Sequence, residues 1–296
     1  MSRGNPLSGA VIAAPAERPR DHELDLYGLT HPGLVRDENQ DHFLLGTVHP
    51  QVVIHGTSLP EVDRLPTRGQ RLATVMLVAD GVGGGSDGGQ ASRLAVEAIM
   101  GYVSSTMECC YAVVSGSDTQ LFAALRKAAA EAHAVVQRQA AAADLPAVMA
   151  TTLTLVVAVW PSAYVLQVGD SRCYFFSEGT LRQVTRDQTV AQDLVDMGVL
   201  PAERAASSPY RNVLARAIGA AEATPEVTRL DISERGSVLL LCSDGLTKHV
   251  SDEEIAGHVM SMQSSEQLCR SLVELALARG GTDNVTVLAG RAVGGR

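Results

Sequence analysis

The order of apolar patterns along the chain is the feature that most restricts its fold. Strand-like runs come first, followed by two segments with helical spacing, further strand-like runs, two more helical segments and a last strand. A parallel sheet would require strands and helices to alternate, whereas segregated runs favour antiparallel sheets. The order therefore predicts an α+β fold in which two packed sheets carry a pair of helices on each outer face.

The individual elements follow from the spacing of apolar residues and from helix-capping patterns. The predicted helices cover residues 90–107, residues 118–143, a segment that begins with the capping box of Ser251 and Glu254, and a segment from Ser264 or Ser265 to about Gly280. The predicted strands cover residues 24–28, 41–45, 72–79, 151–159, 163–168, 172–177, 181–184, 238–242 and 284–289.

Two connecting stretches contain proline and break the periodic pattern. Residues 46–71 surround the short apolar run 52–54, which is either part of a long hairpin connection or an added edge strand. Residues 187–218 combine a short helical pattern with prolines and are predicted to form an irregular insertion.

Acidic residues stand at the ends of several apolar runs. The aspartates in such positions are Asp41, Asp80, Asp244 and Asp283. A carboxylate at the end of a buried strand needs water, a hydrogen bond or a metal ion to offset its desolvation. Two carboxylates ~4 Å apart would repel by ~4 kcal/mol at an effective dielectric constant of ~20. If the four meet in space, they therefore predict a carboxylate-lined metal site.

A simple turn is the competing interpretation of each Asp-Gly pair, because Asp-Gly is a frequent hairpin signal, and Asp87-Gly88 fits it. The segment after Asp80 differs, since residues 81–85 are almost free of bulky side chains. The backbone carbonyl of Gly81 could then approach a cation closely. Hard cations prefer carboxylate, carbonyl and water oxygens, so the pattern favours Mg²⁺ or Mn²⁺ over zinc.

Composition narrows the class of protein. With 296 residues, 46% of them hydrophobic, the chain can bury a large core, and a net charge of −9 argues against nucleic acid or an anionic membrane as partner. The adjacent Cys109 and Cys110 form no CxxC pair, and no apolar run approaches a membrane span. We expect a cytoplasmic monomer in which residues 1–22 and 292–296 are tails and residues 23–291 form one domain.

Several segments, taken together and in order, resemble the metal-dependent serine/threonine protein phosphatases of the type 2C (PPM) class in their bacterial form. They extend over roughly residues 24–290 and comprise residues 33–41, 78–84, 150–152, 168–172, 181–187, 212–219, 241–246 and 283–287. The resemblance implies a four-layer α/β/β/α sandwich with a dinuclear metal centre at one end of the two sheets. It also implies that residues 187–215 form a flap beside that centre.

The resemblance further implies roles for the aspartates. Asp80 would bridge two metal ions, with the Gly81 carbonyl on one of them, and Asp244 and Asp283 would hold the other. Asp41, together with Gln40, would act through metal-bound water.

Two further residues take roles from the resemblance. Arg36 would bind the substrate phosphate, because a guanidinium can offer two parallel hydrogen bonds to phosphate oxygens. Asp170 would support a third, weaker metal ion, with a pairing to Arg172 as the alternative. Asn284 is expected to hold its neighbour Asp283 by hydrogen bonds, and Cys242 is expected to be a small core residue.

The chain departs from the family pattern at three positions. Val82 stands where some members carry a histidine proposed as general acid. Lys248 stands where many members carry an aspartate that supports the third metal, so an ammonium group should weaken or replace that site. Gln40 replaces the glutamate of animal relatives.

The function implied is hydrolysis of phosphoserine and phosphothreonine in proteins by a hydroxide that bridges two Mn²⁺ or Mg²⁺ ions, opposing a eukaryotic-like serine/threonine kinase. Two alternatives stay open. One is a catalytically weak or inactive scaffold that binds phosphoproteins, and the other is a phosphatase of small metabolites.

Overall fold

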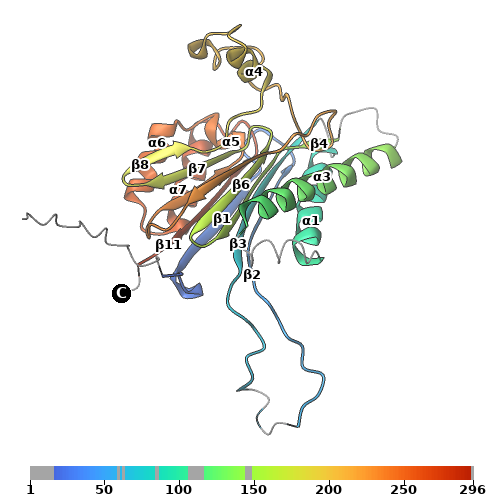
Figure 1. Ribbon diagram of the computed structural model, residues 1–296. Helices are drawn as coiled ribbons and strands as arrows, with labels where there is room; N and C mark the ends of the chain where they lie inside the picture. The colour runs from blue at the N-terminus through green and yellow to red at the C-terminus, as the bar shows by residue number, and fades with distance from the viewer. Residues whose placement is uncertain are drawn as a thin grey trace, which may run out of the picture.

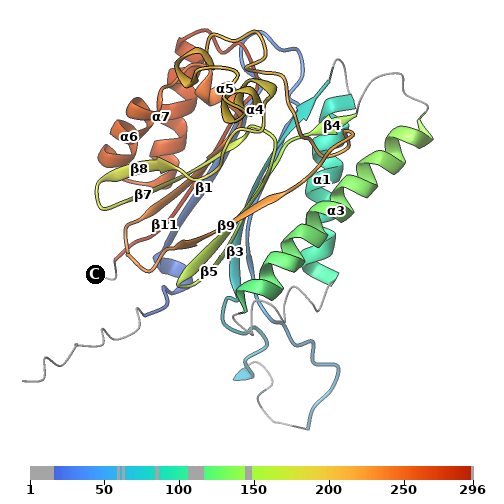
Figure 2. The ribbon, with the colours of Figure 1, turned by 45° about the horizontal axis from the view of Figure 1, so that its top comes forward.

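Two antiparallel sheets pack face to face in a computed structural model that describes residues 17–58, 61, 64–83, 87–105, 117–143 and 149–294 (Figures 1 and 2). Sheet A has the strand order β1 (Leu24–His31), β11 (Val285–Ala292), β10 (Val238–Cys242), β7 (Arg172–Ser177) and β8 (Thr180–Gln183). Sheet B has the order β2 (Asp41–Val48), β3 (Ala73–Val82), β5 (Leu153–Val159), β6 (Ser162–Val168) and β9 (Glu226–Asp231), and the short β4 (Ala150–Thr151) pairs with the end of β3.

Helix pairs cover the outer faces of both sheets. Sheet B is covered by α1 (Asp87–Ser105) and α3 (Asp118–Ala142), and sheet A by α6 (Asp252–Ser261) and α7 (Ser265–Ala278). Figure 2 shows the resulting order of layers, which confirms the predicted α/β/β/α sandwich. The other helices within the described ranges are α4 (Val190–Asp196), α5 (Asp244–Thr247) and the 3₁₀ turns at Asp21–Glu23 and Ala202–Arg204.

The continuous apolar run of β3 explains why this strand lies in the middle of the stack. Successive side chains of a strand point to opposite faces. Val75 and Leu77 pack toward the helices, whereas Met76 and Val78 pack toward sheet A. A strand buried on both faces reads as unbroken hydrophobic sequence rather than as an alternation.

Capping residues mark the helix starts as the sequence predicts. The side chain of Ser251 accepts a hydrogen bond from the backbone amide of Glu254, and the Glu254 carboxylate accepts one from the amide of Ser251. Ser264 caps α7 in the same way, by accepting from the amide of Gln267. Both predicted starts are therefore confirmed.

Two predictions about strands need correction. Beyond Val48, the described residues up to 72 form an irregular connection with one isolated bridge between Gln51 and Arg68, so the hairpin connection is right and the edge strand at 52–54 is wrong. Strand β9 was not predicted, because it is an edge strand whose mostly exposed side chains leave only Leu230 buried.

Other predictions concern residues outside the described ranges or have a simple outcome within them. The predicted end of the first helix beyond residue 105, and Cys109 and Cys110, lie outside them. Cys173, Cys242 and Cys269 are buried free thiols. Within the described part of the chain, no helix combines the length and apolar character needed to cross a membrane.

Candidate active site

Both sheets deliver acidic residues to the same end of the sandwich. Asp41 opens β2 and lies opposite Asp80 in the register of β2 with β3. Asp244 follows β10 as the first residue of α5, and Asp283 lies just before β11. Asp80, Asp244 and Asp283, together with Asp170, line one cavity of about 720 Å³ including its opening to solvent.

Asp41 lies behind this cavity and is almost fully buried, at 3% exposure. Its Oδ2 accepts hydrogen bonds of 2.7 Å from both Ser243 Oγ and Thr286 Oγ1. Its Oδ1 is also buried but has no hydrogen-bond partner among the described residues. Burial raises the pKa of Asp41 to about 6, against the effect of the two hydroxyl donors. An acceptor oxygen buried without a donor is a position that a cation or a water would satisfy.

The hydroxyls on Asp41 belong to a longer chain of hydrogen bonds. Thr286 has one hydroxyl proton, and a carboxylate can only accept, so that proton goes to Asp41. The Thr30 hydroxyl, 2.8 Å away, must then donate to Thr286, and the side-chain Nδ2 of Asn39 donates to Thr30 Oγ1 at 2.9 Å. The chain of donors therefore points toward the Asp41 carboxylate.

The backbone around Asp80 is fixed by two threonines. The Asp80 amide donates to Thr152 Oγ1 at 3.0 Å, and the Asp80 carbonyl accepts from Thr151 Oγ1 at 2.8 Å and from the Thr152 amide at 2.9 Å. Burial and the neighbouring carboxylates, Asp41 first among them, raise the pKa of Asp80 well above its usual value. Burial and Asp244 likewise raise the pKa of Asp170 to about 8.

A basic residue partly compensates this negative charge. Lys248 Nζ lies 2.6 Å from Asp244 Oδ2 and 2.7 Å from Asp283 Oδ2. Burial raises the pKa of Asp244, and the nearby ammonium opposes that rise. Partial burial acts upward on the pKa of Asp283 as well, but hydrogen bonds from Lys248 and Arg36 outweigh it and the net shift is downward.

Arg36 binds Asp283 with both ends of its fork. Its Nε lies 2.8 Å from Asp283 Oδ1 and its Nη2 lies 3.0 Å from Oδ2. The side chain remains 55% exposed and lines the cavity. Arg36 is thus placed at the mouth of the site, where it contacts a carboxylate that the sequence predicted as a metal ligand.

Gly81 permits a close approach between two backbone segments. A Cβ atom at Gly81 would lie 2.3 Å from the carbonyl oxygen of Gly88 in the first turn of α1. The requirement for glycine here comes from packing between backbones, and the Gly81 residue also lines the cavity. Gly84 and Gly85 lie outside the described residues.

The alternative role of Asp170 as a partner of Arg172 is wrong. Arg172 binds Asp187 instead, with Nη2 2.7 Å from Oδ2, and also donates to the Tyr174 hydroxyl at 2.9 Å. Asp170 therefore faces the cavity without that guanidinium.

Asn284 does more than the sequence suggested. Its backbone amide donates to Asp283 Oδ1 at 3.0 Å, as expected. Its side chain instead holds the loop between β1 and β2, because Nδ2 donates to the carbonyls of Pro32 and Glu38 and Oδ1 accepts from the Gln40 amide. This loop carries Arg36. No sequence signal could reveal the contact, since the partners are more than 240 residues apart.

Cys242 has no place in this chemistry. The side chain is fully buried in the core between sheet A and its helices. Burial raises the pKa of its thiol to about 12, so the thiolate is a minor species at neutral pH. The prediction of a core residue agrees with this environment.

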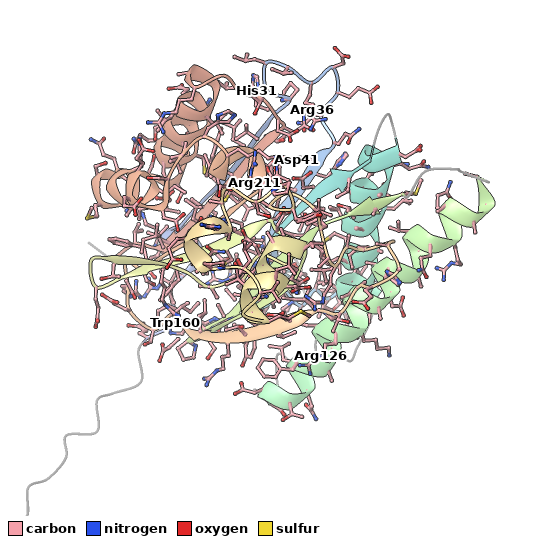
Figure 3. All side chains as sticks on the ribbon, turned by 90° about the horizontal axis from the view of Figure 1, so that it is seen from above. His31, Arg36, Asp41, Arg126, Trp160 and Arg211 are labelled. Atoms are coloured by element: carbon pink, nitrogen blue, oxygen red, sulfur yellow. The ribbon has the colours of Figure 1, made fainter. Side chains whose placement is uncertain are left out.

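The insertion around α4 rises above this end of the sandwich (Figure 1) and widens the site. A larger cavity of about 1690 Å³, again including open solvent, is lined by Arg36 and Lys248 and by Arg211 of the insertion. In the view from above (Figure 3), Arg211 lies over the end of the sandwich at which Arg36 and Asp41 are labelled. Arg211 is exposed, and no side-chain hydrogen bond or ion pair joins it to another described residue. Arg211 was not among the residues predicted from the sequence.

The donor set fits a hard divalent cation in its chemistry. The cavity presents carboxylate and backbone oxygens, and Asp41 adds a buried oxygen without a donor. The described side chains are nevertheless not gathered for an ion, since they contain no group of three or more His, Cys, Asp or Glu residues that could hold one. Lys248 stands between two of the carboxylates. The residues therefore fit a metal site only if the Lys248 ammonium moves away from Asp244 and Asp283.

Comparison with known proteins places the chain in a family. The family model described as protein phosphatase 2C matches residues 56–278. The serine/threonine protein phosphatase PstP of Mycobacterium tuberculosis is 36% identical over 218 residues, which is 73% of this chain but only 40% of the length of that relative.

Solved structures agree with this match. A crystal structure of the M. tuberculosis phosphatase PstP/Ppp has a TM-score of 0.71 at 30% identity and covers 92% of this chain and 99% of its own. The catalytic domain of PstP in complex with 2 manganese ions has a TM-score of 0.70 at 29% identity, with 92% and 99% covered. With the family model matching most of its length, this chain belongs to the protein phosphatase 2C family.

Proposed function

We propose that this chain hydrolyses phosphoserine and phosphothreonine in proteins and that Mn²⁺ or Mg²⁺ is its cofactor. The observation that carries the proposal is the cavity at the end of the two sheets, where Asp80, Asp170, Asp244 and Asp283 meet Arg36. The proposal is supported by membership of the family and by a relative that is named a serine/threonine protein phosphatase. The structure of PstP with 2 manganese ions supports the choice of cofactor.

The proposed ligands are the residues around the cavity and one behind it. Asp80 and the Gly81 carbonyl would hold one ion, and Asp80, Asp244 and Asp283 the other. Asp41 would act through water, and Asp170 would serve a third, weaker ion. Two such ions would lower the pKa of a water molecule and neutralise phosphoryl oxygens.

The residues of the chain orient the substrate and keep the site in shape. The guanidinium of Arg36 would bind two oxygens of the substrate phosphate, which must first displace the Asp283 carboxylate from it. Asn284 holds the loop that carries Arg36 in place. The insertion above the site, with its exposed Arg211, restricts which part of a protein can reach the cavity.

The bridge of Lys248 to Asp244 and Asp283 is the observation that favours an inactive phosphoprotein-binding scaffold. Phosphatase assays on a phosphothreonine peptide, on p-nitrophenyl phosphate and on phosphorylated metabolites, with Mn²⁺ or with EDTA, separate the hypotheses. Peptide hydrolysis that requires Mn²⁺ supports our proposal. No hydrolysis of any substrate at saturating Mn²⁺ indicates a scaffold, and hydrolysis of metabolites alone indicates the small-molecule enzyme.

Variants then test the residue roles. Asp80→Asn and Asp244→Asn should lose activity while circular dichroism shows an unchanged fold, and Arg36→Ala should mainly raise KM. Asp37→Asn is the matched control, because Asp37 is an exposed carboxylate next to Arg36 that does not line the cavity. Full activity in Asp244→Asn at low Mn²⁺ would contradict the assignment.

We also propose that the chain acts in the cytoplasm as a monomer and opposes a serine/threonine kinase. Its net charge of −9 supports protein substrates over nucleic acid. Phosphoproteomics of a strain lacking the protein would identify the substrates, and light scattering would give the oligomeric state.

A further inference from the structure

Lys248 is the described basic residue that contacts both carboxylates on the sheet A side of the cavity. Asp283 has a second cationic partner in Arg36, whereas among the described residues only Lys248 lies within ion-pair distance of Asp244. The Lys248 side chain is 26% exposed, so it is partly withdrawn from solvent. These contacts are unlike a surface ion pair, in which two solvated chains meet with little gain.

Local structure directs Lys248 to this position. The four-residue helix α5 begins at Asp244, and the Lys248 amide donates to the Asp244 carbonyl at 2.9 Å. Residues four apart on a helical turn lie on the same side, so the ammonium returns to the carboxylate of Asp244. From there it also reaches Asp283, 35 residues further along the chain.

We propose that Lys248 is an internal counter-ion that holds Asp244 and Asp283 together in the metal-free protein and must release both when a divalent cation binds. The inference rests on the proposed function, because it assumes that the cavity binds Mn²⁺ or Mg²⁺. It makes metal binding an exchange of one cation for another rather than the filling of a preformed site.

The exchange follows from the atoms that are shared. Lys248 occupies the Oδ2 atoms of Asp244 and Asp283 at hydrogen-bond distance. Mg²⁺ binds carboxylate oxygens at about 2.0–2.1 Å, so an ion on the same oxygens would lie next to the ammonium and repel it.

Lys248 has room to leave. Its side chain lines the cavity at the end of the two sheets and also the larger cavity beneath the insertion. A flexible four-carbon stem can move the ammonium from one cavity to the other without a change in the backbone. The stem would then lie beneath Arg211 and the insertion.

Manganese binding by a neutral variant tests the proposal. Lys248→Met keeps an unbranched side chain only one atom shorter and removes its charge, and Lys127→Met removes the charge of the other lysine, which is exposed on α3. Binding is followed without turnover, by the electron paramagnetic resonance signal of free Mn²⁺. We expect Lys248→Met to bind Mn²⁺ at least tenfold more tightly than the wild type, and Lys127→Met to bind within twofold of it.

A second measurement uses the wild-type protein, so it does not depend on the folding of a variant. Lys127 and Lys248 are the only lysines, and ¹⁵N-lysine labelling therefore gives two side-chain signals. Saturating Mg²⁺, which is diamagnetic, should shift the Lys248 signal and leave that of Lys127 in place.

The outcomes separate this inference from the proposed function. Equal Mn²⁺ affinity in Lys248→Met and wild type, or a Lys248 signal that stays unchanged at Mg²⁺ saturation, overturns the inference and leaves the phosphatase standing. Absence of Mn²⁺ binding in every variant and in the wild type overturns both. Tighter binding by Lys248→Met together with the shift of the Lys248 signal supports the exchange.

Discussion

Replacing Thr286 by valine should weaken the fold through the charge on Asp41. Valine has the shape of threonine and suits a strand, so the change mainly removes the hydroxyl that donates to Asp41 Oδ2 at 2.7 Å. A buried hydrogen bond to a charged group contributes about 1.5–3 kcal/mol, and the Thr30 hydroxyl also loses its acceptor. We expect a loss of about 2–3 kcal/mol in the free energy of unfolding at pH 8.

The pH dependence identifies the carboxylate as the cause. Burial raises the pKa of Asp41 to about 6, so the group is ionised in the folded protein at pH 8 and protonated at pH 5. Hydroxyl donors favour the ionised form, hence their removal costs most above pH 6. At pH 5 the cost of Thr286→Val should fall to about 1 kcal/mol, the size of a neutral hydrogen bond.

Urea unfolding followed by circular dichroism, in EDTA at both pH values, measures this difference. Thr30→Val is the control, because it loses only neutral partners and should cost about 1 kcal/mol at either pH. A cost of Thr286→Val that is the same at pH 5 and pH 8, or no larger than that of Thr30→Val, would refute the reasoning.

Three further predictions follow from the site. Gly245→Ala should lower the melting temperature strongly, because its Cβ would lie 1.9 Å from the Asn284 carbonyl oxygen, whereas Gly257→Ala in α6 has nothing within 4 Å and should be neutral or stabilising by up to ~1 kcal/mol. Burial raises the pKa of Asp170 to about 8, so the folded state keeps a proton that the unfolded state loses near pH 4. The metal-free protein should therefore become less stable to urea as the pH rises from 4 to 8. A stability that does not change over this pH range would count against a buried, protonated Asp170. Arg211→Ala should leave the melting temperature unchanged but raise KM for a phosphopeptide severalfold, and an unaltered KM would remove the insertion from substrate contact.

Local signals made much of the fold predictable. The capping box of Ser251 and Glu254, the helical spacing of residues 118–143 and the unbroken apolar run of β3 each depend on neighbours in sequence. Strand β9 was not predicted, because an edge strand with few buried residues has no apolar pattern to detect.

The site was predictable only in part, for a related reason. Acidic residues at the ends of apolar runs indicated where carboxylates would gather, and the family resemblance assigned Lys248 to the position of a metal-supporting aspartate. The contact of Lys248 with Asp283 and the hydroxyl of Thr286 on Asp41 join residues that only the tertiary fold brings together. Spacing along the chain carries no information about such pairs.

The hydrogen bonds on Asp41 also cross from one layer of the sandwich to the other. Asp41 belongs to sheet B, whereas Ser243 and Thr286 follow or lie in strands of sheet A. Sliding of one sheet over the other would stretch these polar links, while the apolar packing elsewhere between the sheets could adjust. Substitutions at the interface between the layers, such as one at Met76 or at Gly290 beside it, should therefore alter catalysis from a distance by changing the alignment of the sheets.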